Sequence, residues 1–326
     1  MNTFDKILER YRREINRHIS SALTKREPVS MYEAGKYVLD GGGKRIRPLL
    51  TLFSCDAVGG RWKDAVPAAL AVEILHNFTL VHDDIMDMSD SRRGRATVHK
   101  KWNDNIAILV GDALVAVAYH SLLESKSGRL QEITSFFTDG LLEVCEGQTL
   151  DMEFEYMDDV TVERYLQMIE KKTGALLKIA AAIGGVIGNA DKKQLRVLKE
   201  FGSFLGLAFQ IQDDILDVVA DETKLGKPMH NDIKTGKRTY LLLYANEHAK
   251  KRKKAALKKV FNRTVRDTED IQAVLDVYAQ TNATEAAQKA VAHYTFKAEK
   301  CLQKLPKTPG RDNLISFAKM LLSREY

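Results

Sequence analysis

Residues 80–87 read LVHDDIMD, and residues 210–217 read QIQDDILD. Each motif follows a long run in which apolar residues recur every three or four positions, as they do on the buried face of an α-helix. Within each motif the first and last aspartates lie one helical turn apart, about 6 Å along the axis and on the same face. Like charges at this spacing destabilise a helix unless a cation compensates them. The two motifs therefore predict two buried helices, each with an acidic, cation-binding end.

The helical period extends over most of the chain, and no sustained strand-like alternation is present. It recurs over residues 4–23, 63–88, 103–124, 129–156, 161–187, 192–219 and 271–303. Short polar or glycine-rich breaks, such as DGGG and SRRGR, separate these segments, and no long Pro- or Gly-rich linker divides the chain. We therefore predict an all-α fold of ten or more helices, forming a single large helical bundle and a single domain over residues 1–326.

The composition is that of a soluble globular protein. Hydrophobic residues make up 44% and charged residues 29% of the 326 residues, which excludes disordered and collagen-like classes. Three widely spaced cysteines match neither a zinc site nor a secreted disulfide framework. No secretory signal is recognisable at the N-terminus, and no stretch approaches the ~18 apolar residues of a membrane span. These features favour a cytoplasmic protein without stable membrane insertion.

The net charge of +6 has a local origin. Residues 249–266 contain nine basic residues and no acidic one. Such a run can attract nucleic acid or acidic lipid. However, Leu257, Val260 and Phe261 fit the buried stripe of a helix with a basic solvent face, so we favour that interpretation and predict no nucleic-acid partner.

The acidic motifs predict a magnesium site that also holds phosphate. Carboxylate oxygens suit Mg²⁺, which rarely takes an all-protein cage and shares its coordination shell with water and substrate phosphates. The spacing of a calcium-binding EF-hand loop is missing. Two acidic clusters therefore predict a diphosphate held through bridging Mg²⁺. The candidate ligands are Asp83, Asp84, Asp87, Asp213, Asp214 and Asp217.

Basic residues stand beside both acidic motifs. Residues 41–48 read GGGKRIRP, a glycine-rich turn that lacks the pattern of a phosphate-binding P-loop but carries three bases. No nucleophile–base signature and no dinucleotide-binding motif is present. The remaining chemistry is the metal-assisted ionisation of a diphosphate ester. Further bases or polar groups are Arg92, Arg93 and His99 after the first motif, Lys172 and Thr173 between the motifs, and Lys227 and Lys237 after the second.

Between about residues 30 and 245 these motifs resemble, in order, those of the trans-isoprenyl diphosphate synthases. They are GGGKRIRP, DDIMD followed by RRG and His99, KTG at 172–174, and FQIQDDILD followed by GKP. The resemblance implies the isoprenoid synthase fold around a deep central apolar cavity, usually in a homodimer. It also implies head-to-tail condensation of isopentenyl diphosphate with an allylic diphosphate, supported by two to three Mg²⁺ ions that bridge the acidic clusters and the allylic diphosphate.

When the roles of the family's motif residues are assigned to the matching positions of this sequence, the resemblance implies a role for each polar residue. Isopentenyl diphosphate would be held by Lys44, Arg47, His76 and Arg93. The allylic diphosphate would contact Arg92, Lys172, Thr173, Gln210, Lys227 and Lys237. Of these, Arg92, Lys172 and Thr173 are the candidate catalytic residues. The allylic diphosphate would reach the six aspartates through Mg²⁺.

Three other functions are compatible with parts of this pattern. A terpene cyclase also uses an aspartate-rich motif, but it would show an Asn/Ser/Glu metal motif in place of the second cluster. A non-catalytic regulatory subunit of a synthase could lose one cluster, whereas both are intact here. Nucleic-acid binding through residues 249–266 would give a strongly salt-dependent affinity for DNA.

The residues before Asp83 bear on product length. Phe78 lies five positions earlier, about 7.5 Å deeper along the helix, where its ring can form the floor of the cavity. Thr79 and Leu75 would line the same wall. An aromatic residue at this position resembles the archaeal-type geranylgeranyl synthases of the family. We therefore predict geranylgeranyl diphosphate (C20) as the main product, ahead of farnesyl diphosphate (C15) and of longer chains.

Overall fold

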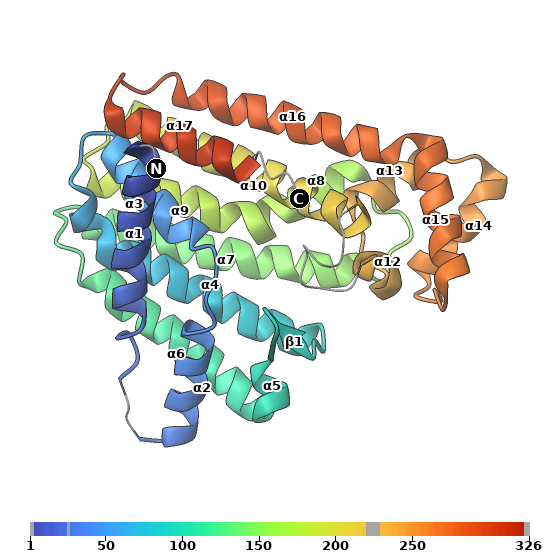
Figure 1. Ribbon diagram of the computed structural model, residues 1–326, viewed down its shortest axis with the longest axis horizontal. Helices are drawn as coiled ribbons and strands as arrows, with labels where there is room; N and C mark the ends of the chain where they lie inside the picture. Colours follow the sequence, from blue (N-terminus) through green and yellow to red (C-terminus); the bar gives the residue numbers. More distant parts are fainter. Residues whose placement is uncertain (1–2, 25–26, 220–228, 323–326) are drawn as a thin grey trace. The chain divides into compact units, whose positions relative to one another are not determined.

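The computed structural model describes residues 3–24, 27–219 and 229–322 (Figure 1). The chain divides into two compact units. Unit 1 comprises Met1–Leu141, Ile179–Lys199 and Leu302–Phe317. Unit 2 comprises Leu142–Lys178, Glu200–Cys301 and Ala318–Tyr326. Their boundaries fall inside or at the ends of helices α7 (Leu130–Phe154), α9 (Ala175–Ile187), α10 (Lys192–Val219), α16 (Ala283–Leu302) and α17 (Pro309–Leu322).

The other elements each belong to one unit. Unit 1 contains α1 (Thr3–Ile19), α2 (Val29–Leu39), α3 (Ile46–Ala57), η1 (Trp62–Ala65), α4 (Val66–Met86), β1 (Ser91–Arg92), β2 (Arg95–Ala96), α5 (Val98–Lys101) and α6 (Asp104–Leu123). Unit 2 contains α8 (Val162–Ile169), the π-helical turn η2 (Glu170–Gly174), α12 (Asn231–Thr235), α13 (Tyr240–His248), η3 (Lys251–Lys253), α14 (Lys254–Phe261) and α15 (Thr268–Thr281).

Unit 1 is organised around α4, which packs along α6 and also contacts α1, α2 and α3. An aromatic cluster fixes α1 and α17 to α3: the ring centroid of Phe53 lies 4.9 Å from that of Tyr11 and 5.0 Å from that of Phe317. All three rings are almost completely buried. The first helical segment predicted from sequence, residues 4–23, is confirmed up to Ile19, and its buried residues Leu8, Tyr11, Ile15 and Ile19 form one apolar face.

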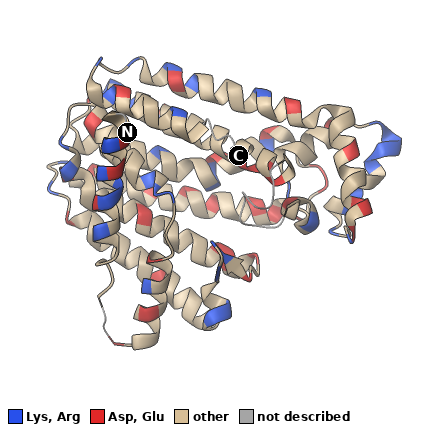
Figure 2. Ribbon diagram, viewed as in Figure 1, with Lys and Arg blue, Asp and Glu red and all other residues tan. Residues whose placement is uncertain are grey.

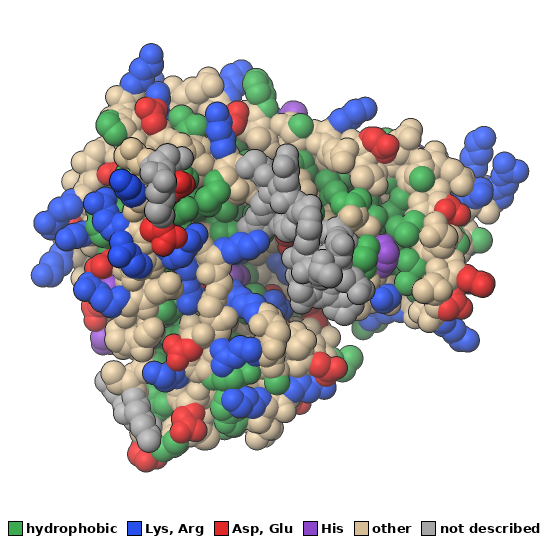
Figure 3. Space-filling model, viewed as in Figure 1, with side chains coloured by type: hydrophobic (Ala, Val, Ile, Leu, Met, Phe, Trp, Pro, Cys, Tyr) green, Lys and Arg blue, Asp and Glu red, His purple; other side chains and the backbone are tan. Residues whose placement is uncertain are grey.

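The core of unit 2 is built by α8, α10, α13 and α15. Three consecutive leucines of α13, residues 241–243, are fully buried, so the first half of this helix is enclosed by the core, whereas Glu247 and His248 at its end are exposed. Leu257, Val260 and Phe261 of α14 join the same core, as predicted. Figure 2 shows Lys and Arg gathered over η3 and α14, and Figure 3 shows their side chains protruding into solvent.

The helical segments predicted from periodicity are confirmed, with three refinements. The segment 271–303 is two helices, because Asn282 adopts a left-handed backbone (φ 53°) between α15 and α16. The segment 161–187 is interrupted by the π-helical turn η2. The break at SRRGR forms a two-stranded antiparallel hairpin, which is too short to show an alternating pattern. The all-α fold class is confirmed.

Two helical stretches, Trp62–Met86 and Asp104–Leu123, are long and apolar enough to cross a membrane by length and composition. The expectation that no stretch reaches this level is therefore wrong. The first stretch is 67% buried in the folded chain, so packing accounts for its apolar composition. The second is only 39% buried. The absence of stable membrane insertion stays a prediction.

Candidate active site

The first acidic cluster stands at the carboxyl end of α4, where its three aspartates have different surroundings. Asp84 is buried, and Arg92 donates a hydrogen bond from Nε to its Oδ1 at 2.7 Å. Burial raises the pKa of Asp84, and Arg92 opposes that rise. Asp83 is half-buried and Asp87 is exposed, with the Asp87 N–H bonded to the Asp83 carbonyl oxygen at 2.8 Å. One carboxylate is thus paired inside unit 1, and two stand one turn apart nearer the surface.

The β1–β2 hairpin brings a second arginine to the glycine-rich turn. Arg93 and Gly94 both have positive φ (53° and 71°), as the two central residues of a tight hairpin turn require. The Arg93 guanidinium donates to the Gly42 carbonyl oxygen. A Cβ on Gly43 would lie 3.0 Å from that guanidinium, which explains the glycine. The turn and the hairpin, 50 residues apart in sequence, therefore form one local structure.

His76 of α4 lies among these bases. Its pKa is lowered well below the ordinary value, first by burial and then by the charges of Arg47, Arg93, Arg92 and Arg45. The imidazole is therefore neutral, and its Nδ1 has no hydrogen-bond partner among the described residues. Clustered guanidinium groups around a neutral donor or acceptor form a strongly positive environment suited to an anion with several oxygens. The geometry brings together three of the four residues predicted to hold isopentenyl diphosphate. Lys44, the fourth, is exposed two residues before the start of α3.

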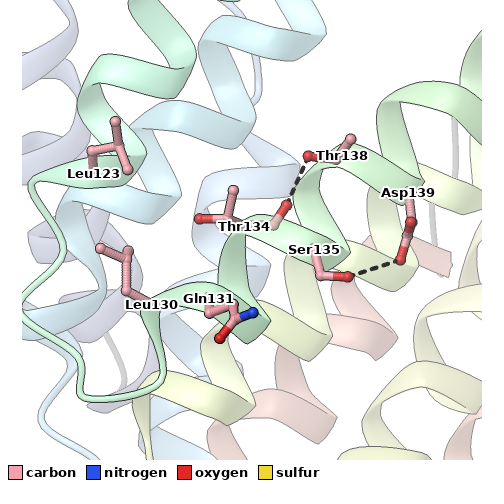
Figure 4. A pocket seen from close by; sticks show the side chains of 7 residues that line it. All are labelled: Leu123, Leu130, Gln131, Thr134, Ser135, Thr138 and Asp139. Atoms are coloured by element: carbon pink, nitrogen blue, oxygen red, sulfur yellow. Dashed lines mark hydrogen bonds between the residues drawn. The ribbon is translucent and has the colours of Figure 1, made fainter.

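Described residues of unit 1 line a small and a larger pocket. The small one, of about 50 Å³, is lined by Asn77, Asp84, Arg92, Arg93 and Arg95 among others, so it coincides with the basic site. The larger one, of about 550 Å³, lies between the end of α6 and the start of α7 (Figure 4). Its wall includes Leu123, Leu130 and Asp139, the last hydrogen-bonded to Ser135 at 3.4 Å. Of the predicted site residues that the structure describes, none lines this second cavity.

The second acidic cluster lies on α10 in unit 2, and its member Asp214 is buried and accepts three hydrogen bonds. Tyr165 donates from its hydroxyl to Asp214 Oδ2 at 2.6 Å, and the Tyr240 N–H donates to the same oxygen at 3.0 Å. Gln210 donates to Oδ1 at 3.2 Å. Burial and the neighbouring Asp232 raise the pKa of Asp214 to about 7.

The other two aspartates of this cluster differ in exposure. Asp217 is fully buried and accepts a hydrogen bond from the Asp232 N–H at 3.0 Å. Asp213 is half-buried. The acidic group of unit 2 thus includes Asp232, which comes from the segment after the motif and was not predicted from sequence.

The KTG motif forms the π-helical turn η2 and connects to this cluster. Thr173 donates from Oγ1 to Gln210 Oε1 at 2.8 Å, and Gln210 in turn bonds Asp214. Lys172 forms an ion pair with Asp151 of α7. Single-turn π segments frequently occur at functional sites. Thr173 and Gln210, both predicted to contact the allylic diphosphate, are therefore linked by hydrogen bonds to the second acidic cluster, whereas the neighbouring Lys172 pairs with Asp151.

The remaining predicted residues are placed as follows. Lys237 is half-buried, and its N–H bonds the Asp232 carbonyl oxygen at 3.0 Å, beside the second cluster. Lys227 lies outside the described residues. Of the proposed chain-length residues, Leu75 is fully buried, whereas Thr79 and Phe78 are half-buried, with the Phe78 ring 4.8 Å from that of His82.

Sequence reasoning missed Tyr165, Asp151 and Asp232. No local signal marks the first two, since each meets its partner across at least 21 residues of sequence. A faint signal existed for Asp232, which stands five residues before the predicted Lys237.

The carboxylates fit Mg²⁺ by their chemistry. Within the described ranges, no three His, Cys, Asp or Glu side chains are grouped closely enough to hold a metal by themselves. Mg²⁺ prefers oxygen ligands and completes its shell with water and phosphate, so one or two protein carboxylates per ion suffice. Asp83 and Asp87, on one face of α4 near the surface, provide such a pair.

Comparison with known proteins identifies the family. The model of the polyprenyl synthetase family matches residues 28–278. The chain belongs to the polyprenyl synthetase family. It is 36% identical to the short chain isoprenyl diphosphate synthase of Methanothermobacter thermautotrophicus over 98% of both chains. It is also 36% identical to the geranylgeranyl diphosphate synthase of Methanosarcina mazei over 95% of both.

Solved structures agree with this assignment. The crystal structure of geranylgeranyl pyrophosphate synthetase from Pyrococcus horikoshii matches with a TM-score of 0.93 and 37% identity, covering 99% of this chain and 98% of that one. A decaprenyl diphosphate synthase from Rhodobacter capsulatus matches with a TM-score of 0.90 and 30% identity. The expected enzyme class, a prenyl-transferring synthase, is confirmed for this polyprenyl synthetase.

Proposed function

We propose that this polyprenyl synthetase condenses isopentenyl diphosphate with allylic diphosphates head-to-tail, with geranylgeranyl diphosphate as its main product. The observation that carries the proposal is the positive environment of His76, where the charges of Arg47 and Arg93 act on a neutral imidazole seven residues before Asp83. It supports a second diphosphate site beside the one served by the first acidic cluster, which a synthase with two diphosphate substrates needs and a terpene cyclase does not.

The residues take the following parts in the proposed reaction. Asp83 and Asp87, with the aspartates of the second cluster, would hold two to three Mg²⁺ ions, and the bound ions would neutralise the leaving diphosphate. Arg92, Lys172 and Thr173 donate hydrogen bonds to that diphosphate as its bond to the allylic carbon breaks. The isopentenyl double bond attacks the allylic cation, and the proton then passes to the released diphosphate. No protein base is assigned.

The proposed product size rests on the relatives and on one side chain. Several archaeal relatives are named geranylgeranyl diphosphate synthase, including that of Saccharolobus solfataricus at 40% identity over 85% of this chain. A geranylfarnesyl diphosphate synthase of Natronomonas pharaonis is also similar, at 33% identity. The aromatic ring of Phe78, five residues before Asp83, supports geranylgeranyl diphosphate over the longer geranylfarnesyl diphosphate.

We further propose that the two units act as one catalytic domain in a cytoplasmic homodimer. The family match includes residues of both units. Ile108, Leu109 and Leu123 of α6 are 44%, 53% and 58% exposed, which is typical of a helix that a second protein chain covers. None of the three cysteines, all of which lie among the described residues, forms a disulfide, which supports a reducing compartment. Light scattering during size exclusion tests the dimer.

The experiment for the function is turnover by the purified chain alone. Isopentenyl diphosphate is supplied with dimethylallyl, geranyl or farnesyl diphosphate, with Mg²⁺ or with excess chelator, and dephosphorylated products are separated by chromatography. We expect a C20 alcohol that requires Mg²⁺. Asp83→Ala and Asp213→Ala should each lower the rate by about 100-fold or more while helical circular dichroism is retained. A chain without turnover would favour a regulatory subunit, and near-normal rates in either variant would refute the role of the clusters.

A further inference from the structure

Arg45 stands between Lys44 and Arg47 in the glycine-rich turn, yet its side chain does not face solvent. Only 4% of it is exposed, whereas Lys44 is exposed and Arg47 half-buried. Its guanidinium makes three hydrogen bonds: Nη1 donates to Glu73 Oε1 at 2.8 Å, Nε to Asn16 Oδ1 at 3.0 Å, and Nη2 to the Leu39 carbonyl oxygen at 3.2 Å. Arg45 therefore ties the turn to α1, to α4 and to the end of α2.

The backbone of Arg45 is held in an unfavourable conformation. It is the N-cap residue of α3 with φ 54°, and a left-handed conformation costs a non-glycine residue about 1 kcal/mol or more. Such a conformation persists only where the surroundings enforce it. The Arg45 carbonyl also accepts the Leu49 N–H at 3.2 Å, the first hydrogen bond of the helix. The buried side chain of Arg45 therefore determines where α3 begins. It also fixes the direction in which the side chain of Arg47, two residues later, extends from the helix.

The partner carboxylate lies one turn from the centre of the basic site. Glu73 is on α4, three residues before His76, and its side chain is 2% exposed. The ion pair therefore connects the first turn of α3 to the turn of α4 that carries His76. Because Glu73 compensates the charge of Arg45 at 2.8 Å, Arg45 holds the structure and leaves anion binding to its neighbours.

We propose that the buried Arg45–Glu73 ion pair positions the isopentenyl diphosphate site by holding Arg47 in place beside His76. This inference rests on the proposed function of that site. A purely structural pair would lower the stability of the fold without distinguishing one substrate from the other. A positioning pair changes the affinity for isopentenyl diphosphate selectively.

The test measures both substrates in Glu73→Gln, which keeps the shape of the side chain but removes its charge. We expect the KM for isopentenyl diphosphate to rise about tenfold, as loss of one charged hydrogen bond allows, with the allylic KM within about twofold of the unmodified enzyme. Glu73→Asp, which keeps the charge, should recover part of the loss. Equal changes in both KM values, or an unchanged KM for isopentenyl diphosphate in folded Glu73→Gln, would overturn the proposal.

A second variant covers the case in which Glu73→Gln fails to fold. The double replacement Arg45→Met with Glu73→Leu substitutes apolar side chains for a buried ion pair, which is often neutral for stability. It should fold and still bind isopentenyl diphosphate weakly, whereas normal binding would overturn the proposal. The control is Arg129→Met, which removes a 2.9 Å contact to the Ala190 carbonyl elsewhere in unit 1. It should lower the melting temperature and leave both KM values unchanged, and an equal rise in the isopentenyl KM would also overturn the proposal.

Calorimetric titration of isopentenyl diphosphate into each variant measures affinity without turnover. It therefore tests the positioning role of the ion pair separately from the proposed function. An inactive unmodified chain refutes the proposed function. A selective loss of affinity in Glu73→Gln still supports the positioning role, and an unchanged affinity refutes that role even if the unmodified chain is active.

Discussion

Replacing Gly147 by alanine should displace the KTG turn. Gly147 lies on α7 where this helix passes closest to the π-helical turn η2. A Cβ at this position would lie 2.2 Å from the backbone nitrogen of Lys172 and 2.6 Å from its Cα. Both are backbone atoms, so no side-chain rotation can relieve the contact. Restoring van der Waals contact requires the helix and the turn to separate by about 1 Å.

The size of the effect follows from this displacement. A shift of about 1 Å in a catalytic group can lower the rate by about 100-fold. Overpacking lowers the free energy of unfolding by about 1–3 kcal/mol. The higher helix propensity of alanine relative to glycine offsets about 1 kcal/mol of this loss. We therefore expect Gly147→Ala to remain folded but to lose about 100-fold in kcat, since Lys172 and Thr173 move away from their partners.

The assay is kcat at saturating concentrations of both substrates, with thermal unfolding followed by circular dichroism. Gly140→Ala, on the same helix, is the matched control. Its Cβ would meet the Cδ1 and Cγ2 atoms of Ile179 at 2.6 Å, so it overpacks against a buried side chain of α9 instead of the backbone of the KTG turn. The control should keep kcat within about threefold. If folded Gly147→Ala also keeps kcat within that range, the contact between α7 and the turn does not position Lys172.

Three further predictions concern substrate choice, product length and pH. Arg47→Ala should raise the KM for isopentenyl diphosphate more than the allylic KM, and Lys227→Ala should do the reverse; equal effects on both substrates would reject the assignment. Phe78→Ala should lengthen the product, as chromatography of dephosphorylated products would show, and an unchanged product would mean that another residue sets the length. Burial and the nearby arginines hold the pKa of His76 in the folded chain well below its usual value, whereas an imidazole in the unfolded chain titrates near 6.5. Below about pH 6.5 the unfolded chain therefore binds a proton that the folded chain does not, so the stability of the fold decreases as the pH falls. Urea titrations at pH 5–7 measure the free energy of unfolding of both chains. As the pH falls, His76→Gln should lose less of this free energy than the unmodified chain, by up to about 1.4 kcal/mol per pH unit. Equal pH dependence in the two chains would contradict this prediction.

The helices and the acidic motifs could be predicted because their signals are local. The period of 3.6 residues marks α4 and α10 directly, and each aspartate pair follows its apolar run within the same helix. The π-helical turn could not be predicted in this way. Its conformation depends on close approaches by distant glycines, including Gly147 and Gly206, whose Cβ atoms would lie 2.2 Å and 2.4 Å from the turn's backbone.

The sequence by itself determined that the chain is helical, that two aspartate clusters end apolar helices, and that bases accompany both clusters. Only the tertiary structure decided how deeply each charged group is buried and which groups it meets. Arg45 and Arg47 are the same residue type two positions apart, but Arg45 is buried against Glu73, whereas Arg47 is half-buried near His76. Asp214 likewise differs from Asp213 because Tyr165, 49 residues away, bonds it. Burial and long-range hydrogen bonding separate such neighbours, and neither is encoded in the spacing of residues along the chain.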